Sequence, residues 1–288
     1  MSATEIEAWL QEQTAKTAEE LEAGDGNDPD EIQALRSFLN GTLSATGAAT
    51  AITRPVTRKK DPHWKLQSLW GLLADALVEQ GQEVGKKSLD LLAAIQKLPK
   101  EILANTVIDW PQLEGFGVTW YDYHSPHFHG PNGWESGAEG VLTEERKHEL
   151  YQHCEDKGIA EASIWLRVPN AIAPELGYDV LDLSRSGRAG LYVLIHQIHG
   201  WLKVAGPQLW RGKPMDEVGS YRQCGFGKRT DAPMSEHWAA WEAALVDLSG
   251  DKTSLPEDSR NVAADCLRLL KEAKQSDEKI GQVKKFDT

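Results

Sequence analysis

Two amphipathic segments between residues 63 and 98 constrain the fold more than any other feature of the sequence. In HWKLQSLWGLLADALVEQG and in KKSLDLLAAIQKLP, apolar residues recur every three or four positions. That spacing lines one face of an α-helix. Gly81 and Gly85 separate the two segments, and Pro99 ends the second. Two helices with so short a connection are expected to pack as an antiparallel pair.

The helical period continues through most of the chain. A helix from Thr143 is expected to stop at Gly158, and residues 177–183 are expected to form either a strand or a helical turn. Further helices are expected over 4–23, 30–47, 161–168, 187–206, 234–249 and 255–272. The sequence therefore predicts an all-α fold. It would be a single domain over 1–288 of roughly ten helices, with irregular aromatic loops over one side. Residues 1–28 and 276–288 are expected to be peripheral or frayed.

Charge and composition exclude several classes of partner. The net charge of −13 disfavours free nucleic acid and anionic membranes, because both need a basic surface. No stretch approaches the 18 apolar residues of a membrane span, and the N-terminus lacks a signal-peptide pattern. Three widely spaced Cys residues without a CxxC pair argue against a disulfide framework. A cytoplasmic location is expected.

The segment WYDYHSPHFHGPNGW, residues 120–134, concentrates three His, two Tyr, two Trp and a Phe. Three interpretations stay open. His124, His127 and His129 could converge on a metal ion. The segment could instead be a loop that covers the core, anchored by Trp120 and Trp134. In the third interpretation it lines a ligand pocket, where rings stack on the ligand and His and Tyr direct hydrogen bonds.

A second polar pattern lies on the helix expected over 187–206. Tyr192, His196, His199 and Lys203 fall on one stripe, whereas the rest of the helix is apolar. The helix should therefore be largely buried, with the stripe facing either water or a cavity. In a cavity, two His side chains that titrate near neutrality could serve as acid and base.

Arg167 stands among apolar residues in IWLRVPN and is expected to be buried with an anion. Its partner would be a structural carboxylate, Asp179 or Asp182, or else an acidic oxygen of a substrate held by the guanidinium fork. Four Trp residues at helical spacing are expected in the core: Trp64, Trp70, Trp238 and Trp241.

Several longer patterns resemble a fungal all-helical family of unknown function. They are WKLQSLWGLLADALVEQG, LLAAIQKLP, DWPQL and, near the C-terminus, LWRGKPM, HWAAWEAALVDLS and LPEDSRNVAADCLRLLKEA. The resemblance covers residues 30–275, and these motifs are mostly structural. HSPHFHGPNGW departs from the family pattern. Proteins of this type occur in fungal natural-product gene neighbourhoods. Helical, cofactor-free proteins from such neighbourhoods assist hetero-Diels–Alder couplings, and the chain resembles those cyclases.

The resemblance implies a cofactor-independent cyclase that joins a quinone-methide-like partner, derived from a tropolone or a phenol, to a terpene alkene. Such an enzyme holds two reactants in alignment and polarises a carbonyl. The alternatives are a non-catalytic binding or interaction protein and a metal enzyme that uses the HxxHxH segment. No cofactor and no metal are expected, the expected partners are small apolar or aromatic molecules, and a homodimer is left open. The expected catalytic residues are His124, His196, Arg167 and Tyr123. The expected substrate-binding residues are Trp120, Tyr121, His127, His129, Trp134, Tyr192 and His199.

Overall fold

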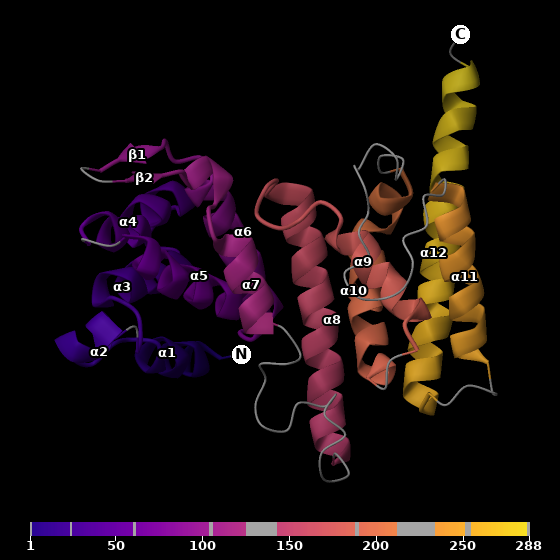
Figure 1. Ribbon diagram of the computed structural model, residues 1–288, viewed down its shortest axis with the longest axis horizontal. Helices are drawn as coiled ribbons and strands as arrows, with labels where there is room; N and C mark the ends of the chain where they lie inside the picture. The colour runs from indigo at the N-terminus through magenta and orange to yellow at the C-terminus, as the bar shows by residue number, and fades with distance from the viewer. Residues whose placement is uncertain are drawn as a thin grey trace. The chain divides into compact units, whose positions relative to one another are not determined.

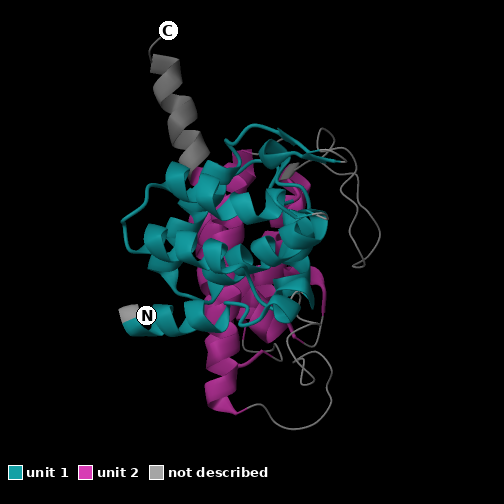
Figure 2. Ribbon diagram, turned by 90° about the vertical axis from the view of Figure 1, so that its left-hand side faces the viewer, with its two compact units in different colours: residues 1–131, 167–172 teal, residues 132–166, 173–288 magenta. Residues whose placement is uncertain are grey.

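The computed structural model confirms the all-α class. It describes residues 2–23, 25–59, 62–103, 106–124, 143–187, 190–211, 234–250 and 255–286. These residues form 12 α-helices and one short antiparallel hairpin (Figure 1). The helices group into two compact units (Figure 2). Unit 1 comprises residues 1–131 and 167–172, and unit 2 comprises residues 132–166 and 173–288.

Unit 1 is built around the helix pair expected from the sequence, which packs together as α5 and α6. Helix α5 also contacts α7, and α4 contacts both α3 and α6. The helices are α1 (Ala3–Glu12), α2 (Ala18–Ala23), α3 (Pro29–Leu39), α4 (Ala45–Thr57), α5 (Pro62–Val78), α6 (Gln82–Ile95) and α7 (Phe116–His124). Between α6 and α7 lie β1 (Glu101–Ile102), β2 (Val107–Ile108) and the 3-10 helix η1 (Trp110–Gln112).

The apolar stripe of α5 forms the centre of the core in unit 1. Leu66, Leu69, Trp70 and Leu73 are buried, as their spacing predicts. Trp64 was expected in the same core, but 55% of its surface is exposed. It precedes Leu66 by two residues, which places it about 200° around the helix, on the opposite face.

Local signals divide the N-terminal region more finely than the sequence analysis predicts. The helix expected over 4–23 forms two helices, α1 and α2, and Ser2 caps the first. The helix expected over 30–47 ends at Leu39. Gly41 then adopts a left-handed conformation (φ 73°), and the hydroxyl of Ser44 accepts the Gly47 N–H to begin α4.

In unit 2, helices α10 and α11 both pack against α12. Residues 177–183, left undecided by the sequence, lie mainly in helix α9. The elements are α8 (Glu144–Arg167, whose last residue belongs to unit 1), α9 (Leu176–Asp182), the 3-10 helix η2 (Leu183–Arg185), α10 (Leu191–Arg211), α11 (Met234–Ser249) and α12 (Glu257–Phe286). Among the described residues, no helix is both long and apolar enough to cross a membrane.

The expected helix stop at Gly158 is wrong, because α8 continues through it to Arg167. A Cβ atom at position 158 would lie 2.3 Å from the backbone oxygen of Gln197 in α10. In turn, a Cβ atom at Gly200 of α10 would lie 2.5 Å from the backbone oxygen of Glu155. The two glycines therefore permit a close crossing of α8 and α10 and do not end a helix.

Candidate functional site

A groove of about 580 Å³ lies between α5 and α7 in unit 1. Helix α5 contributes Trp64 and helix α7 contributes Val118 and Tyr123, whose exposed fractions are 55%, 68% and 45%. Asn27 and Glu114, from segments outside these two helices, also line the groove. Large apolar side chains that remain exposed beside one another are typical of a binding surface.

The two faces of α7 explain why its apolar residues line the groove. Phe116, Trp120 and His124 recur every fourth position and are buried. Their rings follow one another along the helix, with centroids 6.0 Å and 4.5 Å apart. Burial of this face turns Val118 and Asp122 outward. The aromatic segment that the sequence analysis singles out therefore begins as a helix, at least as far as His124.

Tyr123 lies across the α5 wall of the groove. A Cβ atom at Gly71 would lie 2.2 Å from the Tyr123 hydroxyl oxygen, so the ring packs where α5 has no side chain. Burial, and secondarily the charge of Asp75, raises the pKa of the Tyr123 hydroxyl. The hydroxyl is therefore protonated at neutral pH and can donate a hydrogen bond to a ligand.

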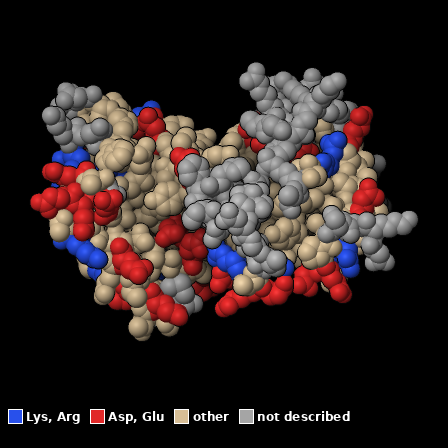
Figure 3. All heavy atoms as spheres, turned by 60° about the horizontal axis from the view of Figure 1, so that its bottom comes forward, with Lys and Arg blue, Asp and Glu red and all other residues tan. Residues whose placement is uncertain are grey.

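The charged groups of the groove are acidic. Asp122 and Glu114 are exposed and make no ion pair with any residue that the structure describes. None of the described lining residues is Lys or Arg, and His63 contacts the Thr106 hydroxyl at 3.0 Å. Carboxylates are also widespread on the face of the molecule drawn in Figure 3. The groove thus presents a negative potential beside an apolar wall.

Asn27 supplies a polar group at the edge of the groove. Its side chain is 5% exposed, and its Nδ2 donates to the backbone oxygen of Gln13 at 3.3 Å. That bond fixes the orientation of the amide, because a carbonyl oxygen can only accept. The Oδ1 atom is buried without a donor among the described residues. An unpaired buried acceptor is costly and is satisfied by any donor that reaches it.

The predicted site residues of the 120–134 segment are in different environments. Trp120 and His124 are buried in unit 1, where His124 Nε2 donates to the backbone oxygen of Ala74 at 3.1 Å. Tyr121 is exposed but does not line the groove, whereas Tyr123 does. The remaining predicted residues of this segment, His127, His129 and Trp134, lie outside the described residues.

The polar stripe of α10 belongs to unit 2, and it packs against neighbouring helices. His196 is 6% exposed, and its ring stacks on Tyr151 of α8 with centroids 4.3 Å apart. Burial lowers the pKa of His196 to about 4, and its Nε2 has no partner among the described residues. Tyr192 is half-buried, meets Tyr151 edge to face, and accepts the Ser259 hydroxyl hydrogen through its backbone oxygen. The expectation that this stripe faces water or a cavity thus fails for His196.

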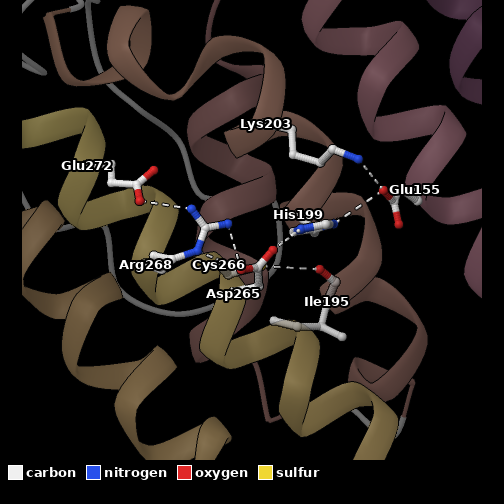
Figure 4. A network of polar contacts seen from close by, with 8 residues as sticks. All are labelled: Glu155, Ile195, His199, Lys203, Asp265, Cys266, Arg268 and Glu272. Atoms are coloured by element: carbon white, nitrogen blue, oxygen red, sulfur yellow. Dashed lines mark hydrogen bonds and ion pairs between the residues drawn. The ribbon is translucent and has the colours of Figure 1, made fainter. Parts of the chain in front are cut away.

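His199 lies between two carboxylates, as Figure 4 shows. Its Nε2 is 2.9 Å from Asp265 of α12 and its Nδ1 is 3.4 Å from Glu155 of α8. Lys203 pairs with the same Glu155 oxygen at 2.8 Å, and Arg268 pairs with Asp265 at 2.7 Å. The pKa of both carboxyls is lowered, against the effect of burial, by these cationic partners and by the bonds to His199. These polar groups link α8, α10 and α12 to one another.

The expected environment of Arg167 is wrong. Its side chain is half exposed and pairs with Asp90 of α6. Neither of the carboxylates proposed from the sequence is its partner. Asp182 instead accepts the indole N–H of Trp241 at 2.6 Å and lies 3.7 Å from Arg185. Because Arg167 ends α8 close to the surface, it needs no buried anion.

Sequence reasoning missed most of the groove. Asn27, Trp64 and Glu114 are far apart in the sequence and share no motif, so only the packing of α5, α7 and the segment before α3 brings them together. Tyr123 was predicted, and Asp122 carried a further signal as an acidic residue between Tyr121 and Tyr123. Comparison of the chain with known protein families, with curated proteins and with solved structures finds no match.

Proposed function

We propose that this chain binds a small organic molecule with an aromatic or apolar body in the α5–α7 groove. The observation that carries the proposal is the set of exposed apolar side chains that line one concave surface: Trp64, Val118 and Tyr123. A rigid indole and a phenol supply contact area at low entropic cost. The volume of about 580 Å³ is within the range of small-molecule sites.

A pair of matched substitutions tests the location of this site. Val118→Trp would fill the groove, whereas Val246→Trp places the same ring on α11, at a position that is also exposed. Calorimetric titration with a panel of neutral and charged aromatic compounds should reveal ligands that bind the wild type and the Val246→Trp variant equally. These ligands should lose at least about tenfold in affinity on Val118→Trp. Equal binding by both variants would place the site elsewhere.

The hetero-Diels–Alder cyclase is a second candidate, and one observation favours it. Tyr123 is the predicted catalytic residue that lines the groove, and its hydroxyl remains protonated. A hydrogen bond from this hydroxyl to the carbonyl of a quinone-methide-like partner would stabilise the charge that develops in the transition state. His124 and His196 are buried, and Arg167 is paired with Asp90, so in this proposal they support the fold.

Replacement of Tyr123 by Phe separates the two candidates once a reactive substrate pair is known. A cyclase that uses the hydroxyl should lose about tenfold or more in kcat and keep its affinity for substrate. A binding protein would show no rate to lose, and an unchanged kcat would remove Tyr123 from the chemistry. The homodimer that the sequence analysis leaves open is untested, and the cytoplasmic location stays a prediction.

A further inference from the structure

We infer that the ligand of the α5–α7 groove is an organic cation, an aromatic ring that carries an ammonium group. This inference rests on the proposed binding function and adds the charge of the ligand to it. Three independent features of the groove lead to it: its aromatic wall, its uncompensated carboxylates and its unpaired acceptor.

The aromatic wall suits both parts of such a ligand. Trp64 and Tyr123 are 55% and 45% exposed and line the groove from α5 and α7. The face of an indole is the best aromatic partner for a cation, and it also stacks on other rings. Either ring can therefore hold the aromatic body while the other lies near the charge.

The carboxylates determine which sign of charge the groove accepts. Asp122 and Glu114 are exposed, lack ion-pair partners among the described residues, and have no Lys or Arg beside them in the described lining. An anionic ligand would meet two like charges and no counter-charge, which disfavours its binding. An ammonium ion would gain from both carboxylates, and the attraction would be screened by salt.

The unpaired acceptor indicates a hydrogen-bond donor on the ligand. Asn27 lines the groove, is almost completely buried, and has an Oδ1 atom without a donor among the described residues. An ammonium group carries up to three N–H donors and no acceptor. It can therefore donate to this oxygen, whereas an ether or a ketone, which only accept, could not.

Three indole compounds of similar size test the inference. Tryptamine carries an ammonium group, tryptophol carries a neutral hydroxyl, and indole-3-acetate carries a carboxylate. In calorimetric titrations of the full chain at low salt, tryptamine should bind about fivefold more tightly than tryptophol. Indole-3-acetate should show no binding, and added salt should weaken tryptamine alone.

Substitutions connect the preference to the named carboxylates. Asp122→Asn and Glu114→Gln should each weaken tryptamine about twofold and leave tryptophol unchanged. Glu22→Gln removes the same charge from an exposed position of α2 and is the matched control, for which no change is expected. Trp64→Leu should weaken both compounds, because it removes the shared aromatic wall.

The possible failures are distinguishable. If tryptophol binds as tightly as tryptamine and Trp64→Leu weakens both, the charge inference is overturned and the binding function stands. If none of the three compounds binds at millimolar concentration, both proposals are overturned. If tryptamine binds but Asp122→Asn, Glu114→Gln and Glu22→Gln weaken it equally, the attraction comes from the net charge of the chain, and the assignment to the groove is overturned.

Discussion

Polar side chains are used differently in the α5–α7 groove of unit 1 and in the network around His199 of unit 2. In the network, Lys203 pairs with Glu155 and Arg268 with Asp265, and the His199 ring nitrogens lie against both carboxylates. In the groove, the carboxylates and the acceptor of Asn27 have no such partners among the described residues. Satisfied polar groups hold helices together, whereas unsatisfied groups beside exposed rings are available to a ligand.

The largest effect should follow from a change at the helix crossing of unit 2. Gly200→Ala would place a Cβ atom 2.5 Å from the Glu155 backbone oxygen. We expect a loss of about 3 kcal/mol in the free energy of unfolding, measured by denaturant titration. Gly206→Ala, in the same helix, is the control because its Cβ would lie 3.5 Å from Ala273, an ordinary contact. Equal stabilities of the two variants would contradict the close crossing.

His196 gives unit 2 a pH dependence of predictable sign. Burial lowers its pKa from 6.5 to about 4 in the folded chain, so the unfolded chain binds the proton more readily. Its contribution to stability is complete above pH 6.5 and is lost as the pH falls towards 4. The loss is at most on the order of 3 kcal/mol. His196→Phe keeps a ring against Tyr151 and should remove this part of the pH dependence, as measured by denaturant titrations over that range.

A smaller effect is expected from the network itself. His199→Gln retains hydrogen-bonding capacity but removes the imidazole that lies between Glu155 and Asp265. We expect a loss of about 1 kcal/mol in the free energy of unfolding, because the network is only partly buried. Arg146→Gln breaks an exposed pair with Glu149 and should cost less than about 0.5 kcal/mol. A larger loss for Arg146→Gln than for His199→Gln would show that the network does not stabilise unit 2.

How far the sequence could predict this molecule depends on whether the cause of a feature is local or lies elsewhere in the chain. The stripe of Leu66, Leu69, Trp70 and Leu73 predicted α5 because helix periodicity is a local property. Gly158 was misinterpreted because the reason for a glycine there is the backbone of another helix, which no local pattern reveals. At that crossing, the packing of two helices decides the role of the glycine, and the local sequence signal does not.

The candidate site was harder to predict than the fold for a related reason. The sequence drew attention to clustered His and aromatic residues, and His124, His196 and Trp120 are in fact buried in packed environments. Of the predicted catalytic and substrate-binding residues, Tyr123 lines the groove. The other features of the groove depend on residues as distant in sequence as Asn27 and Asp122, which line one groove only in the folded chain.

The most direct test of the central claim follows two indole N–H resonances during titration with an aromatic amine. Trp64 lines the groove of unit 1, whereas Trp201 is buried in unit 2 and donates to Glu161 at 2.7 Å. Trp64→Phe and Trp201→Phe assign the two signals. If the groove binds the ligand, the Trp64 resonance shifts with saturation and the Trp201 resonance stays in place. A shift at Trp201 with none at Trp64 would contradict the account and place the site in unit 2.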